Sequence, residues 1–399
     1  MAPLEPDAKE RLVASIVREL SATSFACSHL EPLLSGTTNF TFRGCLTTAL
    51  PETQEQTVII KHTTSYVALN KDFAIDVSRC RFEVYALQAL NSFPAVTDAS
   101  GDSFSALSPR LYHFDPAANI QVLQEIRDVL DLRVILDTPS ADLRVSQTQL
   151  ADVGRAAGGW LRRFHQWAVQ PAQRSFAQQV AKNEGMRRLK ARVTCDSFIQ
   201  VLERFPDIYE PHAATLHLFR DMAQQEFQRV PGLNDEEDGW GVIHADFWSG
   251  NILVPSSLLA PAGDADNNDK SRGGSSDKRL AIIDWESCQF GPRAFDIGGM
   301  IGDMCERNHF KGVRAALSAM EGFIAGYGPV SDTVAFRVAM HVGVFLITWF
   351  NRRAPGSALP APLQVAREAM ALGVQLIVRG WKKDKLWLKA SILASLFTE

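Results

Sequence analysis

Paired cysteines and an export signal are absent from this sequence of 399 residues. The six cysteines occur singly, without a CxxC pair, which argues against a zinc site or a thioredoxin-like motif and indicates reduced thiols. The first residues lack a charged segment followed by an apolar one, so we do not expect a secreted protein. These absences predict an intracellular protein with a cytoplasmic location.

An excess of positive charge and a long apolar run are also missing. The formal net charge is −4, whereas nucleic-acid-binding domains usually carry clustered Lys and Arg, so no nucleic-acid partner is expected. The longest apolar stretch, Val338 to Phe350, is interrupted by His341. It falls short of the ~18 residues that a membrane span needs, so we expect no membrane insertion.

The first third of the chain predicts strands around one helix. Apolar residues at helical spacing predict a helix over residues 77–90. Segments rich in β-branched and aromatic residues predict strands at residues 39–46, 57–63, 109–115 and 119–126. Together they predict a small antiparallel sheet with one helix against it.

After residue 126 the pattern is mainly helical. The clearest helix contains residues 150–168, with Ser146 or Thr148 as its N-cap, and His165 beside its apolar stripe is either structural or catalytic. Further helices are predicted near residues 177–205, 211–229, 309–326, 332–350 and 362–379.

One segment, residues 261–279, has no large apolar residue and is rich in Gly, Ser, Asp and Asn. Such a segment buries too little surface to offset its ordering entropy, so we predict a disordered loop. Because it joins the apolar runs "NILV" and "LAIIDW", we expect a hairpin with a lengthened tip.

Polar side chains cluster at the ends of these apolar runs. Asp246 and Asn251 occur in "GVIHADFWSGNILV", and Asp284 ends the run "LAIID". Hard cations prefer oxygen ligands of this kind, and Mg²⁺ is commonly held by one or two carboxylates together with substrate phosphates. The pattern therefore indicates chemistry on a nucleoside triphosphate.

Phosphoryl transfer requires a base for the attacking hydroxyl, metal ligands, a cation on the phosphates and a cover over them. Asp246 is the candidate base, and Asn251 and Asp284 are the candidate Mg²⁺ ligands. The cation would be Lys61, which ends the apolar run "VIIK". We expect a salt bridge to Glu83, on the following helix, to position it.

The candidate cover is the turn "LLSGTTNFTFR", residues 33–43, which contains Gly36, small hydroxyl residues and Asn39. Its glycine and short side chains allow the backbone to fold closely over phosphates.

These motifs together resemble a known family. "HADFWSGN" resembles the HxDxxxxN catalytic loop of the aminoglycoside phosphotransferase and choline kinase superfamily. "IIDWE" followed by "GPRAFDIGG" resembles that family's metal-binding segment and the later aspartate that steadies the loop. The details "DWESCQFGP" and "KDFAIDVSRCRFEVYAL" are similar to the methylthioribose kinase-like branch, and within it to the fungal 4-hydroxytryptamine kinases. The resemblance covers about Leu33 to Asp303.

The resemblance implies an α+β, bilobal, protein-kinase-like fold, with ATP and Mg²⁺ as cofactors. Residues 1–126 would form an N-lobe with a small antiparallel sheet, and residues 127–399 a mainly helical C-lobe. Gln124 and Ile126 would bind adenine through backbone groups between the lobes.

Two further roles follow from the resemblance: His244 would support the catalytic loop by hydrogen bonding, and Asp296 would steady it. The chain also departs from its relatives twice. Its cover has one glycine, Gly36, where relatives often have two. Asn251 stands where methylthioribose kinases tend to carry serine.

The acceptor-binding candidates have alternative interpretations. Trp248 could line the acceptor pocket or pack beneath the loop, and Glu286 is a further candidate. Asp303 could pair with a cationic amine or only border the cleft. Arg352 and Arg353 could bind a carboxylate or phosphate, or simply complement the dipole at the end of a helix.

The sequence thus predicts an ATP-dependent kinase that phosphorylates a hydroxyl of a small-molecule metabolite. An amine-bearing alcohol or phenol, such as a hydroxytryptamine-like compound, is the favoured acceptor. A methylthioribose-type sugar kinase and a catalytically silent, kinase-like binding protein are the alternatives. The choice between monomer and homodimer is left open.

Overall fold

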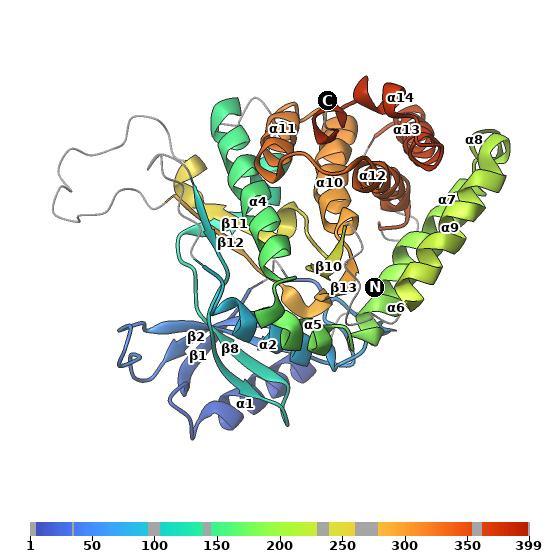
Figure 1. The fold of residues 1–399 in the computed structure, drawn as a ribbon. Coiled ribbons are helices and arrows are strands. Elements are labelled where there is room, and N and C mark those ends of the chain that lie inside the picture. Colours follow the sequence, from blue (N-terminus) through green and yellow to red (C-terminus); the bar gives the residue numbers. More distant parts are fainter. Residues whose placement is uncertain are drawn as a thin grey trace.

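The computed structural model describes residues 5–33, 36–94, 104–138, 145–229, 239–259, 278–352 and 361–397, and they form two lobes (Figure 1). The smaller lobe contains a five-stranded antiparallel sheet in the order β1-β2-β3-β8-β7. Its strands are β1 (Cys27–Pro32), β2 (Phe40–Leu46), β3 (Thr57–His62), β7 (Leu111–Asp115) and β8 (Ile120–Leu123). A short hairpin of β4 (Tyr66–Val67) and β5 (Asn70–Ala74) stands beside it.

Two helices flank this sheet, one more than the sequence predicted. Helix α1 (Pro6–Leu20) inserts its buried residues into a core with one face of the sheet, where Val58 and Ile60 of β3 lie. Side chains alternate across a strand, so Ile59 and Lys61 face the opposite side, where they line a cleft. Helix α2 (Arg79–Leu90) lies on that side.

The larger lobe contains two small sheets near the first. One has the order β6-β12-β11-β9, and the other pairs β10 with β13. Their strands are β6 (Ser105–Leu107), β9 (Val129–Asp131), β10 (Trp240–Ile243), β11 (Ile252–Pro255), β12 (Arg279–Ile282) and β13 (Gln289–Pro292). Strands β11 and β12 pair antiparallel, as the predicted hairpin requires. Residues 261–277 of the predicted loop lie outside the described residues.

Strand β6 departs from the predicted organisation. It lies within residues 1–126, the range assigned to the small lobe, yet it pairs in parallel with β12, with Ser105 opposite Arg279. A pairing across such a sequence separation has no local signature, which explains why the pattern of apolar residues did not indicate it.

Helices make up the rest of the larger lobe (Figure 1). They are α3 (Leu132–Asp137), α4 (Gln147–Trp167), α5 (Arg174–Val180), α6 (Glu184–Ala191), α7 (Ser197–Leu202), α8 (Pro206–Tyr209), α9 (Ala213–Gln228), α10 (Ala294–Lys311), α11 (Ala315–Tyr327), α12 (Asp332–Arg352), α13 (Leu363–Trp381) and α14 (Lys385–Lys389). The helix predicted over residues 177–205 is instead divided into α5, α6, a π-helical turn and α7.

Helix α4 begins as predicted with Ser146, whose side chain accepts a hydrogen bond from Gln149 N in a capping box. The glycines of α4 and α11 let these two helices approach closely. A Cβ atom added to Gly158 would lie 2.1 Å from the backbone oxygen of Phe323. The close contact positions α4 beside the core of the large lobe.

Helix α12 contains the longest apolar run. Its window Asp332–Phe350 has a mean hydropathy of 1.6, enough for a membrane span by length and composition, but 78% of the window is buried inside the protein. The core helix of a globular protein has the same properties, and Val338, Val342 and Leu346 belong to the main hydrophobic core.

Candidate active site

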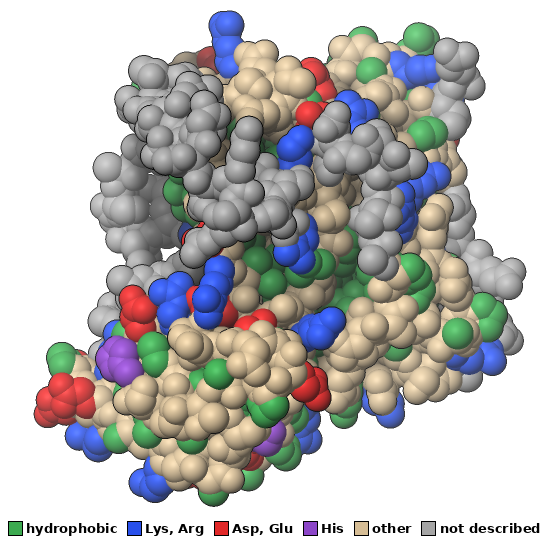
Figure 2. All heavy atoms as spheres, turned by 90° about the vertical axis from the view of Figure 1, so that its left-hand side faces the viewer, with side chains coloured by type: hydrophobic (Ala, Val, Ile, Leu, Met, Phe, Trp, Pro, Cys, Tyr) green, Lys and Arg blue, Asp and Glu red, His purple; other side chains and the backbone are tan. Residues whose placement is uncertain are grey.

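A cleft of about 410 Å³ lies between the two lobes. Figure 2 shows hydrophobic side chains in the hollow between the small lobe below and the helical lobe above. Eight of the residues predicted for nucleotide and metal binding line the cleft: Gly36, Asn39, Lys61, Glu83, Gln124, Ile126, Asn251 and Asp284.

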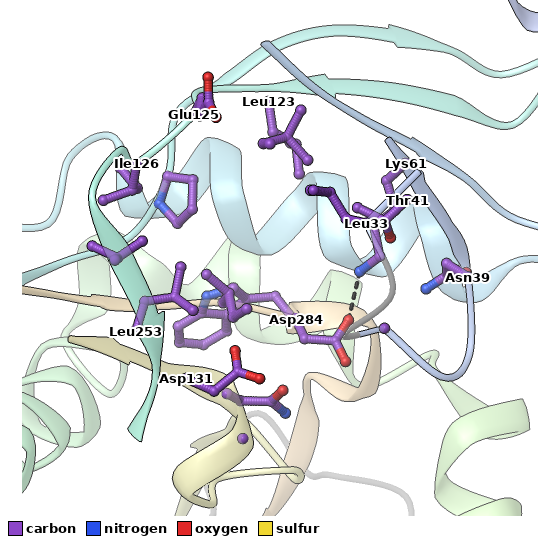
Figure 3. A pocket seen from close by; sticks show the side chains of 18 of the residues that line it. Leu33, Asn39, Thr41, Lys61, Leu123, Glu125, Ile126, Asp131, Leu253 and Asp284 are labelled. Carbon is purple, nitrogen blue, oxygen red and sulfur yellow. Dashed lines mark hydrogen bonds and ion pairs between the residues drawn. The ribbon is translucent and has the colours of Figure 1, made fainter. Parts of the chain in front are cut away.

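The inner part of the cleft is an apolar slot. Ile59 and Leu123 are paired on neighbouring strands of the small lobe, and Leu253 and Ile283 come from the large lobe. The linker of residues 124–126 closes one side of the slot (Figure 3). The N–H of Gln124 donates to the backbone oxygen of Arg110 at 2.8 Å, which ties the linker to the small lobe. A flat aromatic ring fits such a slot.

A buried ion-pair cluster lies deeper in the cleft. Lys61 Nζ lies 2.9 Å and 2.8 Å from the two carboxylate oxygens of Glu83. It lies 2.5 Å from Asp284 Oδ1 (Figure 3). Burial alone would lower the pKa of Lys61, but the carboxylates of Asp284 and Glu83 outweigh it and raise the pKa. Lys61 is therefore held as a cation at the position predicted for it.

A second cluster joins the cover to the segment that follows Asp284. Arg79, fully buried, donates to Glu286 Oε2 at 3.0 Å and to Asn39 Oδ1 at 2.8 Å, and Asn39 Nδ2 donates to Glu286 Oε2 at 2.7 Å. Burial and the nearby Asp284 raise the pKa of Glu286 to about 7. The predicted acceptor role of Glu286 does not fit this arrangement, because its carboxylate is buried between Arg79 and Asn39.

The cleft also offers oxygen ligands for a divalent cation. One carboxylate oxygen from each of Glu83, Asp284 and Glu286 lies within 4.8 Å of the others, but Lys61 and Arg79 already neutralise part of this charge. Asp284 is partly exposed and faces the cleft together with Asn251. A carboxylate and a carboxamide oxygen suit Mg²⁺, so the donor set fits the expected ion.

The side chain of Asp296 on α10 holds the catalytic loop through backbone N–H groups of the loop. Asp296, at the start of α10, accepts from His244 N at 2.8 Å and from Ala245 N at 2.7 Å. Ala245 has a φ of 63°, a left-handed conformation that is unfavourable for a residue with a Cβ. The buried carboxylate thus stabilises a strained turn. His244 lies beneath it, with Nε2 3.0 Å from the backbone oxygen of Ile283.

Asp246 projects from this turn with 35% of its side chain exposed. Asn251 Nδ2 donates to the backbone oxygen of Asp246 at 2.9 Å and contacts its Oδ2 at 3.3 Å. These contacts place the candidate base directly beside a candidate metal ligand. Lys190 of α6 lies on the other side of the carboxylate, with Nζ 2.5 Å from Asp246 Oδ1.

For Asp303 the sequence left two roles open, pairing with a cationic amine and bordering the cleft, and the structure shows a different one. It is 1% exposed, and it accepts hydrogen bonds from Arg307 Nη2 at 2.9 Å and from Ser249 N at 3.2 Å. Arg307 in turn pairs with Asp137. Asp296 and Asp303 therefore hold the two ends of the catalytic loop from one face of α10.

For the other acceptor-binding candidates, Trp248, Arg352 and Arg353, the structure gives little support for contact with an acceptor. Trp248 is half-buried: Arg133 lies over its ring at 5.6 Å from the centroid, and a Cβ atom on Gly250 would lie 2.5 Å from the ring. These contacts match the packing interpretation. Arg352 ends α12, its side chain lies outside the described part of the structure, and Arg353 lies outside the described residues.

His165 is a structural residue. It is 1% exposed, with Nδ1 2.9 Å from the hydroxyl of Tyr327 and Nε2 3.1 Å from Asp296 Oδ2. Burial lowers its pKa, against the opposing effect of Asp296. It therefore orients the aspartate that holds the catalytic loop.

The sequence did not reveal two residues of the site, Arg79 and Lys190. Arg79 lies one helical turn before Glu83, and this spacing was the available signal for a residue on the cleft side of α2. Lys190 lies in "MRRLKAR", where nothing distinguishes it from its basic neighbours. Its partner is 56 residues away, so only the tertiary fold reveals the pair.

Comparison with known proteins gives relatives over most of the chain. A phosphotransferase of Cladobotryum sp, FrzJ, is 26% identical over 398 residues, which cover 97% of this chain and 96% of that protein. The 4-hydroxytryptamine kinase of Psilocybe cyanescens is 24% identical over 86% of this chain and 85% of its own length. No model of a protein family matches the chain.

Solved structures of similar fold include a choline/ethanolamine kinase family protein from Mesorhizobium loti. It covers 93% of this chain and 98% of its own, with 14% identity and a TM-score of 0.47. An aminoglycoside phosphotransferase from Alicyclobacillus acidocaldarius covers 98% of both chains, with 16% identity and a TM-score of 0.45.

The predicted resemblance to the fungal 4-hydroxytryptamine kinases and the predicted enzyme class are confirmed, because the relatives are named as a phosphotransferase and as 4-hydroxytryptamine kinases. The predicted fold class is confirmed as well: the chain has an antiparallel sheet in a small lobe and a mainly helical large lobe with a cleft between them.

Proposed function

We propose that this protein transfers the γ-phosphoryl group of ATP to a hydroxyl of a small-molecule metabolite. The observation that carries the proposal is the joint placement of Lys61, Glu83 and Asp284 in one cleft, with Asp246 and Asn251 adjoining them. They supply the base, the metal ligands and the phosphate-directed cation that phosphoryl transfer requires.

The nucleotide would lie with its base in the apolar slot and its phosphates toward Lys61. The linker of residues 124–126 offers backbone groups to the edge of the base, as its position beside the slot allows. Lys61, fixed by Glu83, neutralises phosphate charge without having to reorganise during the reaction.

Asp246 would accept the proton of the acceptor hydroxyl as that oxygen bonds to the γ-phosphorus and the bond to the β-phosphate oxygen breaks. Its partial exposure, and the hydrogen bond from the preceding Ala245 N–H to Asp296 of α10, orient it toward an incoming molecule. Mg²⁺, held by Asn251 and Asp284, would supply charge neutralisation on the phosphates when bound.

For the acceptor we favour an amine-bearing alcohol or phenol of the hydroxytryptamine type. The support is the relationship to two proteins named 4-hydroxytryptamine kinase, at 24% and 23% identity. Asp303 does not supply the partner for an ammonium group, because Arg307 and the Ser249 N–H occupy it. Such a group would require another contact.

The test is acceptor-dependent release of ADP from Mg-ATP by the purified protein, with a panel of hydroxytryptamines, other phenols, amino alcohols, thiopentoses and aminoglycosides. Wild-type protein should turn over at least one of the amine-bearing hydroxyl compounds. The Asp246→Asn variant should lose turnover by a factor of about 10³ or more while binding Mg-ATP normally by calorimetry.

Each other outcome has a distinct meaning. Turnover of a thiopentose well above that of every amine would replace our acceptor with a sugar. Mg-ATP binding without turnover of any acceptor would favour a binding protein. Full activity of the Asp246→Asn variant would remove Asp246 from the role of base.

A further inference from the structure

Lys190, which lies outside all the predicted motifs, forms an ion pair with the candidate base, Asp246. Its Nζ lies 2.5 Å from Asp246 Oδ1, and only 14% of its side chain is exposed. An exposed pair of this kind contributes little to stability, whereas this one is partly buried at the end of the catalytic turn. The contact brings a cation from α6 to the group that receives the acceptor.

The segment around Lys190 is fixed at both ends. Asn183, before α6, is buried and donates to the backbone oxygens of Glu286 at 3.0 Å and Cys288 at 2.9 Å. After Lys190, Thr194 Oγ1 donates to the Lys190 backbone oxygen at 2.6 Å. The base of the lysine side chain is therefore anchored to the segment that follows Asp284.

The backbone directly after Lys190 is irregular. Residues Arg192–Asp196 form the π-helical turn η2, and such turns occur frequently at functional sites. The turn lies within the region predicted to be helical near residues 177–205, and regular α-helical geometry ends one residue after Lys190.

Lys190 is also linked to the candidate metal ligands through Asp246. Its ammonium group contacts Asp246, and Asp246 accepts two hydrogen bonds from Asn251. Asn251 lines the cleft together with Asp284. The ammonium group therefore lies one residue away from a group that borders the nucleotide cleft, on the side where the acceptor would bind.

We propose that Lys190 is a catalytic residue that binds the phosphoryl group during its transfer, opposite Lys61. This inference rests on the proposed function. Lys61 would neutralise the phosphates that remain on ADP. Lys190 would neutralise the oxygens of the γ-phosphoryl group that is transferred to the acceptor. Each lobe thereby contributes one cation, one on the donor side of the transferred group and one on the acceptor side.

The charges balance through the step. Before transfer, Lys190 pairs with the carboxylate of Asp246. As the acceptor oxygen bonds to phosphorus, its proton passes to Asp246, and the electron pair of the breaking bond stays on ADP. Asp246 then no longer carries the charge that held Lys190, and the ammonium group pairs with an oxygen of the new phosphate ester.

The first arm of the test is an equilibrium measurement that needs no acceptor. Mg-ADP with aluminium fluoride mimics the phosphoryl group in transfer, and such analogues bind more tightly than ground-state ligands. We would measure Mg-ADP affinity by calorimetry, with and without aluminium fluoride, for wild type, Lys190→Met, Lys190→Arg and Lys182→Met. Lys182 is an exposed lysine shortly before α6 and serves as the matched control.

The second arm is steady-state turnover of the same four proteins with the acceptor found in the panel. Removing one donor that stabilises transition-state charge costs on the order of 100-fold to 1000-fold in kcat. Lys190→Met should show such a loss with an unchanged KM for ATP, and it should lose the gain in affinity from aluminium fluoride. Lys190→Arg should recover part of both, and Lys182→Met should match wild type.

The two hypotheses can fail separately. If Lys190→Met keeps the full gain from aluminium fluoride, the inference about Lys190 is wrong, whether or not turnover is observed. If wild type binds neither Mg-ADP nor Mg-ATP, the proposed function fails and the inference fails with it. Equal losses in Lys190→Met and in unrelated destabilised variants, with a lowered unfolding temperature, would make Lys190 structural only.

Discussion

Lys61 illustrates how one buried cation organises a site at the scale of a single residue. Isolated at this depth it would tend to lose its proton, but three short hydrogen bonds to Glu83 and Asp284 hold it charged. Without the lysine, the negative charges of these two buried carboxylates would repel each other and destabilise the folded protein. The lysine and its two partners are therefore mutually dependent.

The Lys61→Met variant should reduce kcat/KM for ATP by about 100-fold or more, because it removes a preorganised donor to phosphate charge. Glu83→Gln is the milder control, since Lys61 retains its contact with Asp284. Steady-state kinetics with varied ATP measures both. A Lys61→Met variant with normal kcat/KM would show that the cation on the phosphates comes from elsewhere.

Asp303 is the second case in which a residue acts through its neighbours. Asp303→Asn should destabilise the protein by about 3 kcal/mol, because breaking a buried ion pair leaves a charge without its partner. It should also lower kcat, because asparagine has a single uncharged acceptor oxygen, for which Arg307 and Ser249 N at the end of the catalytic loop would compete. Urea unfolding and turnover together measure the two effects.

Asp137→Asn is the matched control for this change, since Asp137 pairs with the same Arg307 but 36% of its side chain is exposed. It should cost less than about 1 kcal/mol. Equal costs for the two variants would contradict the role assigned to Asp303.

The contact of α4 with α11 decides the packing of the large lobe at the scale of elements. Gly154 and Gly158 on α4 lie against the backbone of α11, and Gly322 and Gly326 on α11 lie against that of α4. The backbones approach because none of the four residues has a side chain. Glycine within a helix is otherwise unfavourable by roughly 1 kcal/mol relative to alanine. The packing between the two helices must therefore offset the loss of helix propensity at these four glycines.

Gly158→Ala should lower the free energy of unfolding by about 2 kcal/mol or more, since its Cβ would overlap the Phe323 oxygen at 2.1 Å and overpacking carries a cost of this size. Gly159→Ala is the neighbouring control. Its Cβ would lie 3.7 Å from the oxygen of Gly326, an ordinary contact. That variant should be neutral or stabilised, and chemical denaturation of both distinguishes backbone contact from helix propensity.

Buried histidines link the stability of the whole molecule to pH. His341 lies in the core of the large lobe against the rings of Phe219 and Phe295, and burial, with a smaller effect of Arg337, lowers its pKa to about 3. The unfolded chain takes up a proton at this residue near pH 6.5, whereas the folded chain does not. The stability contributed by the neutral form of His341 is therefore fully present above pH 6.5, and it is lost as the pH falls toward 3.

For His341 alone this loss should amount to about 1.6 kcal/mol between pH 6.5 and 5, because the slope rises to roughly 1.4 kcal/mol per pH unit only well below pH 6.5. Thermal or urea unfolding over this range measures it. The His341→Met variant, which cannot titrate, should have a shallower slope by that amount. An unchanged slope would mean that His341 is protonated or solvated in the folded protein.

Much of the fold was predictable because its signals are local. The strand containing Lys61, the helix of Glu83 and the helix capped by Ser146 were each indicated by spacing and capping residues, within a few residues of the observed bounds. Helix α1 was not predicted, and the pairing of β6 with β12 has no local signal.

The sequence by itself determined the order of the motifs, and with it the enzyme class: a lysine, a helix glutamate, the segment HADFWSGN and then Asp284. Tertiary structure alone decided which polar side chains of the site are already paired with another residue of the protein and which can still bind a ligand. It paired Glu286 with Arg79, Asp303 with Arg307 and Asp246 with Lys190. The reason is that a charge buried on folding must find an opposite charge, and the chain supplies that partner from residues that lie anywhere along its length.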